Sequence, residues 1–315
     1  MKFKIYLHTI CYVLLLLALG LTTISFIACS GSSKQDTENI VQQQSDSVLP
    51  NQNLQLIATL NNKIRETSGL ALLNDVLITH NDKGRSNQIM LLNPDNGNLL
   101  QMITPDNIQN NDWEDLAQNE KYLFIGDMGN NEGERKNLAI HIIAINDINK
   151  NNTEVKSIGS INFTYPDQTE FDVSKKHNFD CEAIICLNNQ LYLFTKNRLD
   201  DKTNLYVLPT TPGNYTAKYI ASFEVGGRIT GADISSNGSK VALLGFNKKS
   251  DCFIWILKDF EGDNLFSGQN KKQIIGTYAQ VGQMEGVAFK NDSTVFISSE
   301  EIVNVNARLY LFSLN

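Results

Sequence analysis

One short motif recurs along the chain and reads Ser68-Gly69-Leu70-Ala71, Glu114-Asp115-Leu116-Ala117, Glu182-Ala183-Ile184-Ile185 and Glu285-Gly286-Val287-Ala288. A diverged fifth copy reads Ala232-Asp233-Ile234-Ser235. Each copy is followed by short apolar segments with the length of β-strands, and no helical period of useful length occurs after residue 60. Strand-rich units that recur at intervals of roughly 50 residues are typical of a repeat architecture.

The strands that follow each motif predict the architecture. Four copies have three further strand-like segments, which makes units of four strands, but the last copy has only two before Asn315. A spare strand-like segment, 54–60, stands before the first copy. We therefore predict an all-β fold, a β-propeller of five four-stranded blades closed by the N-terminal strand 54–60. Six blades are the alternative if the interval between Glu114 and Glu182 contains another unit, and an irregular sandwich is a second alternative.

The N-terminus has the pattern of a secretion signal. Lys2 and Lys4 precede an apolar run at 10–21, and Ala28 stands immediately before Cys29. A small residue before a cysteine at the end of such a run resembles the bacterial lipoprotein signal. The resemblance implies that Cys29 becomes the lipidated first residue of the mature chain. An uncleaved membrane anchor is the alternative.

This resemblance divides the chain into three parts. Residues 1–28 would be the signal peptide, and 29–53 the lipidated cysteine and a polar, flexible tether. Residues 54–315 would form the propeller domain. Ser30 follows Cys29 where a retained inner-membrane lipoprotein commonly has Asp, so we expect an outer-membrane anchor that faces the periplasm.

Charge and missing motifs exclude several classes of protein. The chain has 315 residues, 27 Lys+Arg against 34 Asp+Glu, and a formal net charge of −7. A nucleic-acid surface would need a basic face, so we expect no nucleic-acid partner, and we expect a monomer. The sequence contains no G-x-S-x-G elbow, Walker loop, H-E-x-x-H or G-x-G-x-x-G, and gives no support to the chemistries that use them.

Carboxylates gather at one end of the predicted channel. The first strand of each blade lines the channel of a propeller, and side chains alternate along it. Glu114, Glu182 and Glu285 share one motif position, which Ser68 and Ala232 occupy in the other two copies. Two residues earlier come Glu66, Asp112, Asp180, Thr230 and Gln283. The alternation therefore predicts two stacked polar rings.

Oxygen ligands without paired His or Cys favour a hard cation, Ca²⁺ before Mg²⁺. The candidate metal ligands are Glu114, Glu182, Glu285, Asp112 and Asp180. The alternative is a metal-free role, in which these carboxylates accept hydrogen bonds from backbone N–H groups of neighbouring first strands. No organic cofactor is expected.

The second strands end at the face where the first strands begin, because consecutive strands are antiparallel. The polar residues at these ends are the candidate ligand contacts: His80, Asn81, Asp82, Arg85, Asp127, Asn130, Asn131, Lys196, Arg198 and Glu300. His80 is a candidate general base beside Asp82, and Asp127 is a third catalytic candidate. The alternative is that Asn and Asp in these segments only form turns.

Two motifs resemble a known family. The segments Asp112-Trp113-Glu114-Asp115-Leu116-Ala117 and Gly126-Asp127-Met128-Gly129-Asn130-Asn131 are similar to a pair found in secreted bacterial β-propellers. Members of that family pair a D-W-E-D-[IL]-A strand with a G-D-x-G-[DN]-N strand end, and are described as phytase-like or uncharacterised. The likeness spans most of residues 54–315. It implies the propeller fold and is poorly specific for activity.

We expect an envelope-anchored propeller lipoprotein that binds a small or polymeric ligand at the channel mouth, with a calcium ion, and contacts the membrane through Cys29. The alternative is a calcium-dependent hydrolase, either a phytase-like phosphoesterase or a gluconolactonase-like lactonase. A phosphoesterase needs abundant basic residues at the mouth, and only Arg85, Lys196, Arg198 and Arg135 qualify. Fold alone does not choose between these functions.

Overall fold

The computed structural model describes residues 50–314 except residues 83 and 85. The predicted signal peptide 1–28, Cys29 and the tether as far as residue 49 lie outside the described residues, as does Arg85. Among the helices of the described part, none has the length and apolar composition that crossing a bilayer requires.

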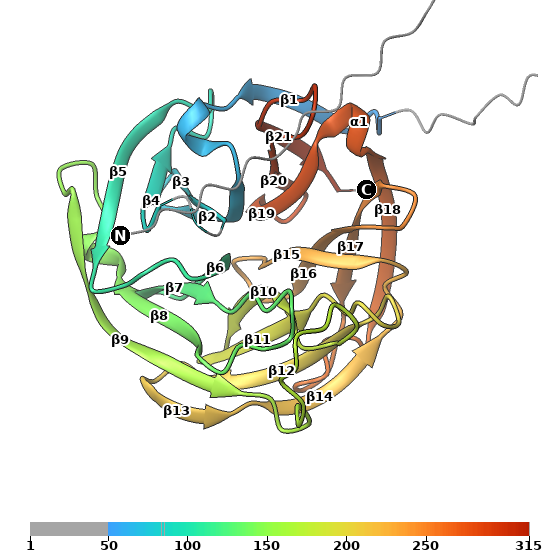
Figure 1. Ribbon diagram of the computed structural model, residues 1–315. Coiled ribbons are helices and arrows are strands. Elements are labelled where there is room, and N and C mark those ends of the chain that lie inside the picture. The colour runs from blue at the N-terminus through green and yellow to red at the C-terminus, as the bar shows by residue number, and fades with distance from the viewer. Residues whose placement is uncertain (1–49, 83, 85, 315) are drawn as a thin grey trace, which may run out of the picture. The chain divides into compact units, whose positions relative to one another are not determined.

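Five four-stranded antiparallel blades are arranged in a ring around a common axis (Figure 1). Their first strands pack against one another along this axis, and the end at which the first strands begin is called the channel mouth. Blade 1 consists of β2 (Thr67–Leu73), β3 (Val76–Asn81), β4 (Ile89–Leu92) and β5 (Leu99–Asp106). Blade 2 consists of β6 (Trp113–Gln118), β7 (Tyr122–Asp127), β8 (Leu138–Ala144) and β9 (Glu154–Thr164). Blade 3 consists of β10 (Cys181–Leu187), β11 (Gln190–Thr195), β12 (Thr203–Pro209) and β14 (Lys218–Phe223). Blade 4 consists of β15 (Arg228–Ile234), β16 (Lys240–Phe246), β17 (Asp251–Lys258) and β18 (Gln269–Thr277).

The two ends of the described chain complete blade 5 together. It consists of β19 (Gln283–Asn291), β20 (Thr294–Glu300), β21 (Arg308–Ser313) and β1 (Leu54–Thr59). β1 pairs antiparallel with β21, so that Leu54 lies opposite Phe312. The predicted closure by the N-terminal strand is confirmed, and the ring has five blades. The interval between Glu114 and Glu182 contains only the remainder of blade 2 and a long loop, so the six-blade alternative is wrong.

Short elements complete the fold without changing the ring. They are the 3₁₀ helices Asn62–Ile64 and Ile145–Asp147, the short helix α1 (Tyr278–Val281) and the strand β13 (Gly213–Thr216). β5 and β13 each pair in parallel with β9, which joins blade 1 and the segment between β12 and β14 of blade 3 to the outer edge of blade 2. The outer edge of β9 is therefore largely paired.

Hydrophobic packing between neighbouring blades stabilises the ring. Five clusters of buried apolar side chains in the described residues each join two adjacent blades. One of them contains Phe194 of blade 3 and Phe253 of blade 4, and both are fully buried. Burying such a side chain contributes about 1.5–3 kcal/mol. Because each blade completes its core only against its neighbours, the ring is stable only when closed.

A β-bulge interrupts every first strand at or near the repeated motif. The register between first and second strands shifts at Ser68/Leu70, Trp113/Asp115, Cys181/Ala183, Ile229/Gly231 and Met284/Gly286. The extra residues are therefore Gly69, Glu114, Glu182, Thr230 and Glu285. A bulge leaves its extra residue outside the ladder and breaks the two-residue alternation of the strand.

The bulges correct the alignment of the five copies. The sequence places Ser68 and Ala232 at the position of the glutamates, whereas the structure places Gly69 and Thr230 there. The alignment from sequence assumed that side chains alternate with a period of two along an uninterrupted strand. One inserted residue in each first strand breaks that alternation, so the alignment is wrong at these two positions.

Candidate functional site

Three buried glutamates lie at one mouth of the channel. Glu114, Glu182 and Glu285 are the bulged residues of blades 2, 3 and 5, and their exposed fractions are only 5%, 2% and 6%. Each carboxylate interacts electrostatically with other acidic groups of the same mouth, Glu114 with Glu182 and Glu182 with Glu285. The bulge therefore brings these side chains together, as the sequence predicted for this end of the channel.

The mouth favours neutral carboxyl groups unless a cation is present. Burial and then the charge of neighbouring carboxylates raise the pKa of Glu114 well above its ordinary value. Burial likewise raises the pKa of Glu182 well above its ordinary value, although Lys196 opposes this. Burial raises the pKa of Glu285 to about 7, and burial together with the charge of Glu285 raises the pKa of Glu300 to about 9. At neutral pH the mouth therefore has more acidic groups than it can hold ionised without positive charge.

Lys196 supplies part of that positive charge. It follows β11 directly, is buried, and places Nζ 2.8 Å from Oε2 of Glu182. Although burial acts to lower it, the carboxylates of Glu182 and Glu285 raise the pKa of Lys196 above its ordinary value. The other oxygen of Glu182, Oε1, is buried and has no hydrogen-bond partner among the residues that the structure describes. Lys196 thus neutralises one side of the mouth and leaves an acceptor unused.

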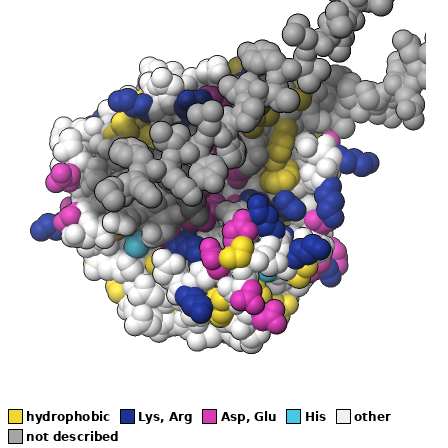
Figure 2. All heavy atoms as spheres, viewed as in Figure 1, with side chains coloured by type: hydrophobic (Ala, Val, Ile, Leu, Met, Phe, Trp, Pro, Cys, Tyr) yellow, Lys and Arg dark blue, Asp and Glu magenta, His cyan; other side chains and the backbone are white. Residues whose placement is uncertain are grey.

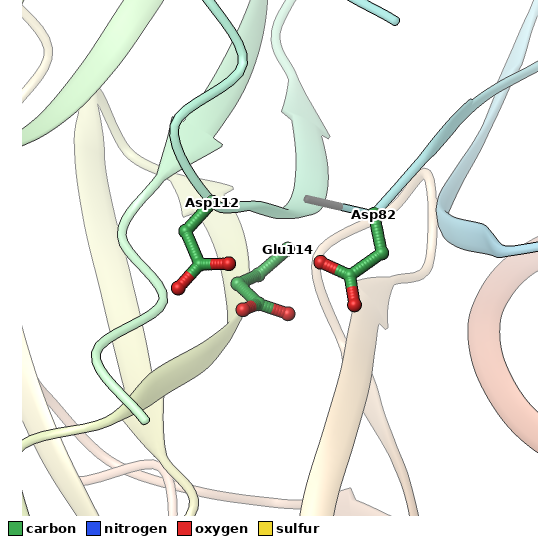
Figure 3. A group of neighbouring side chains, drawn as sticks. All are labelled: Asp82, Asp112 and Glu114. Atoms are coloured by element: carbon green, nitrogen blue, oxygen red, sulfur yellow. The ribbon is translucent and has the colours of Figure 1, made fainter. Parts of the chain in front are cut away.

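On the other side, three carboxylates converge without a lysine among them. Asp82 follows β3, Asp112 precedes β6 and Glu114 belongs to β6, and their side chains point toward a common space (Figure 3). One ligand oxygen from each lies within 4.8 Å of the others. An all-oxygen set of this size suits a hard cation, Ca²⁺ in particular.

Gly129 makes room for this convergence. A Cβ atom at this position would lie 2.0 Å from Oε1 of Glu114 and 2.7 Å from Cγ of Asp112. Any side chain at this position would displace the carboxylates. The second glycine of the G-D-x-G-N-N segment therefore leaves the space that the carboxylates occupy. The arrangement differs from the predicted one, since Asp82 and Asp112 join Glu114, whereas Glu182 pairs with Lys196.

Asp180, a predicted metal ligand, is occupied by other groups. Its carboxylate accepts hydrogen bonds from Nε and Nη2 of Arg198 at 2.9 and 2.7 Å, and from the backbone N–H of Asn130 at 2.7 Å. Although burial acts to raise it, Lys196 and Arg198 hold the pKa of Asp180 below its ordinary value. The structure therefore gives Asp180 a role in joining blades 2 and 3, and Arg198 is not free to clamp a ligand.

Asp127, a candidate ligand contact and catalytic residue, holds a loop in place. Oδ1 accepts hydrogen bonds from the backbone N–H of Asp112 at 3.1 Å and from Nη2 of Arg135 at 2.8 Å. Although burial acts to raise it, the imidazole of His141, whose Nε2 lies 3.6 Å from Oδ2, and the charge of Arg135 hold the pKa of Asp127 below its ordinary value. Arg135 also donates to the backbone oxygen of Gly129 at 2.6 Å. Asp127 and Arg135 thus position the backbone beside the cluster of carboxylates.

His80 lies in the core, which argues against its predicted catalytic role. The side chain is fully buried, and its ring packs edge-on against Trp113 with the ring centroids 5.6 Å apart. Burial lowers its pKa to about 4. Nδ1 lies 3.1 Å from the backbone oxygen of Asn81, so this imidazole has a structural contact rather than an exposed position beside a substrate.

The asparagines of the mouth form turns, as the structural alternative predicted. Asn81 accepts from the backbone N–H of Glu66 at 3.2 Å and donates to the oxygen of Lys63 at 2.8 Å. Asn130 accepts from the backbone N–H of Arg135 at 2.9 Å. Asn131 accepts a hydrogen bond from Arg198. These contacts stabilise loops and explain why amides concentrate there.

Sequence reasoning missed the carboxylates that cap backbones across the channel. Oδ2 of Asp115 accepts from the backbone N–H groups of Ile184 at 3.0 Å and Ala232 at 3.1 Å, which belong to blades 3 and 4. Oδ2 of Asp233 accepts from the backbone N–H of Phe289 at 2.6 Å. The capping role considered for the three glutamates is therefore performed by other residues. Asp115 and Asp233 both occupy the second position of the repeated motif, and this shared position was the sequence signal that could have identified the capping residues.

Figure 2 shows the charge on the face that Figure 1 presents. Among the described residues visible there, Lys and Arg side chains lie next to Asp and Glu side chains instead of forming one continuous basic patch.

Comparisons with known proteins identify no family. No family model matches the chain, and no curated protein matches it. Among solved structures, the PQQ-bound aldose sugar dehydrogenase from Streptomyces coelicolor is 11% identical over 84% of this chain and 99% of that chain, with a TM-score of 0.47. The Dos1 propeller is 13% identical over 74% of this chain and 52% of that one, with a TM-score of 0.38. Likenesses this remote carry no argument about function, and the fold is defined here by the strand pairing.

Proposed function

We propose that this propeller is a calcium-dependent binding module whose channel mouth holds one divalent cation through Asp82, Asp112 and Glu114. The convergence of these three carboxylates opposite Gly129 is the observation that supports the proposal. At 4.8 Å two unit charges repel by about 3.5 kcal/mol in a medium with an effective dielectric constant of about 20. A bound cation would remove this repulsion for all three pairs at once.

The cation would also provide the means of recognition. Ca²⁺ takes six to eight oxygen ligands, which is more than three monodentate carboxylates supply. The open positions would accept carboxylate or hydroxyl oxygens of a ligand that enters the mouth. Lys196 and the partly exposed Glu300 lie near the same mouth and would help to select the charge of that ligand.

Calcium titration tests this proposal. Added Ca²⁺ should bind at one ion per chain and raise the melting temperature, by an amount that corresponds to about 2.7 kcal/mol at a hundredfold excess over Kd. Glu114→Gln should lose the response. Glu120→Gln, an exposed residue just after the same strand, should keep it. If the wild-type protein shows neither heat nor a melting shift in millimolar Ca²⁺, the proposal fails.

Envelope anchoring at Cys29 is the second part of the proposal. It is supported by the charged start, the apolar run and the small residue before the cysteine. Replacing Cys29 by Ser should abolish the incorporation of labelled fatty acid and release the protein from the membrane fraction. Unchanged labelling of the variant would reject lipidation at this residue.

No observation favours the hydrolase alternative over binding. The described basic residues that a phosphoesterase would use are committed, Lys196 to Glu182 and Arg198 to Asp180. A panel of phosphomonoesters and lactones, assayed with Ca²⁺, would nevertheless detect either activity directly.

A further inference from the structure

A cavity of about 1280 Å³ lies at the other end of the ring. The turns that join the first and second strands of blades 1 to 4 line it, with Asn74, Asn119, Asn188 and Asn237 as representatives. Asn119 is five residues along the chain from Glu114, or about 17 Å at the rise of a strand. This cavity is therefore separate from the acidic mouth.

The cavity extends from this end of the ring toward the rim of the propeller. Ile158 of β9, the outer strand of blade 2, lines it, as do residues 210–212, which follow β12 of blade 3. It is thus a groove that runs from the turns at the end of the ring outward between blades 2 and 3. Its volume exceeds the roughly 300–1,000 Å³ of sites for single small molecules, which suits an oligomeric ligand.

The lining is mainly uncharged. Of the described residues around the groove, only Glu120, Lys121 and Asp233 carry ionisable acidic or basic side chains, and the rest are amides, hydroxyls and apolar groups. Ile158 is an apolar residue that remains 51% exposed on the wall. The groove therefore offers apolar contact and neutral hydrogen-bonding groups side by side.

One buried acceptor in this lining lacks a donor. Gln118 donates from Nε2 to the backbone oxygen of Leu72 at 2.7 Å, which orients its amide. Its Oε1 is buried and has no hydrogen-bond partner among the described residues. A buried acceptor without a donor costs about 1–3 kcal/mol, so a ligand hydroxyl that donates to it would be stabilising.

We propose that this groove binds a neutral oligosaccharide. Sugar hydroxyls would donate to Oε1 of Gln118 and exchange hydrogen bonds with the surrounding amides, while the C–H faces of the rings would pack on Ile158 and Pro212. A peptide that binds by adding a strand to a free sheet edge fits less well. The outer edge of β9 is already paired with β5 at residues 154–156 and with β13 at 161–164.

Calorimetric titration with neutral tetrasaccharides tests the inference. The probes are cellotetraose, maltotetraose, xylotetraose and tetra-N-acetylchitotetraose, added to the full-length protein in the presence of EDTA. We expect at least one to bind with a one-to-one ratio, and Ile158→Arg to weaken that binding at least tenfold. Leu56→Arg is the matched control, because Leu56 is also 51% exposed and lies on the outer strand of blade 5. It should bind as the wild type does.

Hydrogen exchange provides a second measurement that needs no variant. The bound tetrasaccharide should protect amides in segments 118–122 and 186–189. The inference is overturned if none of the four probes binds at 10 mM, if Ile158→Arg binds equally well, or if protection falls elsewhere. Binding that requires Ca²⁺ and disappears in Glu114→Gln would also overturn it, because the sugar would then occupy the acidic mouth.

Discussion

Replacing Lys196 by Met tests the electrostatics of the mouth most directly. The substitution keeps the length of the side chain and removes the positive charge that lies 2.8 Å from Glu182. At that distance the attraction is about 6 kcal/mol at an effective dielectric constant of about 20. Desolvation offsets part of this attraction, and breaking a buried ion pair through one partner typically costs about 3–5 kcal/mol.

Two opposite effects should therefore appear in the same variant. In EDTA, we expect Lys196→Met to lower the free energy of unfolding by about 3 kcal/mol, somewhat limited because Glu182 can take up a proton. In Ca²⁺, we expect much of that loss to be restored and the affinity for Ca²⁺ to rise above that of the wild type. The reason is that the variant no longer places a fixed positive charge among the carboxylates.

Urea denaturation with and without Ca²⁺ measures both effects. The control is Lys202→Met, which breaks an exposed ion pair with Glu224 and should cost far less stability than Lys196→Met, because solvent screens the exposed pair. The reasoning would be refuted if both variants lost equally little stability in EDTA. It would also be refuted if Lys196→Met bound Ca²⁺ more weakly than the wild type.

Three further predictions concern other parts of the fold. Gly129→Ala should abolish the rise in melting temperature with Ca²⁺, since its Cβ would lie 2.0 Å from Glu114; an unchanged calcium titration would contradict the role given to this glycine. In EDTA, stability should fall as the pH rises from about 4.5 toward 9, because the folded-state pKa values of Glu285 and Glu300 are raised to about 7 and about 9 and their protonated forms suit the fold. Glu300→Gln should flatten the upper part of that profile, and a melting temperature independent of pH would reject the mechanism. Removal of residues 30–62, which includes β1, should open blade 5 and lower the free energy of unfolding, measured in urea, by several kcal/mol. Removal of residues 30–49 should change it little. Equal stability of the two truncated proteins would show that β1 does not hold the ring closed.

The fold could be predicted because its signals are local and repeated. The motif marks each first strand, and apolar alternation marks the strands that follow. Closure of the ring could be predicted because the sequence has one spare strand, at 54–60, and the last blade lacks one strand after β21. The alignment within blades 1 and 4 could not be found in this way, because a bulge moves the equivalent position to Gly69 and Thr230 without changing composition.

The candidate site was harder to predict than the fold. The geometry of the loops around the mouth determines which carboxylates lie close together. The spacing of residues in the sequence does not contain this information. Asp82 comes from the loop after β3 and approaches Glu114 of another blade, so only the folded ring brings them together. Asp127 and Asp180 have the residue type of ligands, yet each is occupied by an arginine that sequence spacing did not pair with it.

The bulges separate the residues that form the blades from the residues that line the channel mouth. The extra residue of each first strand lies outside the ladder, so replacing it leaves the strand pairing of the blade intact. Positions 114, 182, 230 and 285 therefore act as exchangeable places around one ring, now filled by Glu, Glu, Thr and Glu. Position 69 must stay glycine, because its φ is +61° and a Cβ atom there would lie 2.9 Å from the Cα atom of Asp115. A chain of this design can acquire a new specificity by exchanging single residues on an unchanged frame, and a library randomised at the four other positions would sample mouths of different charge within one fold.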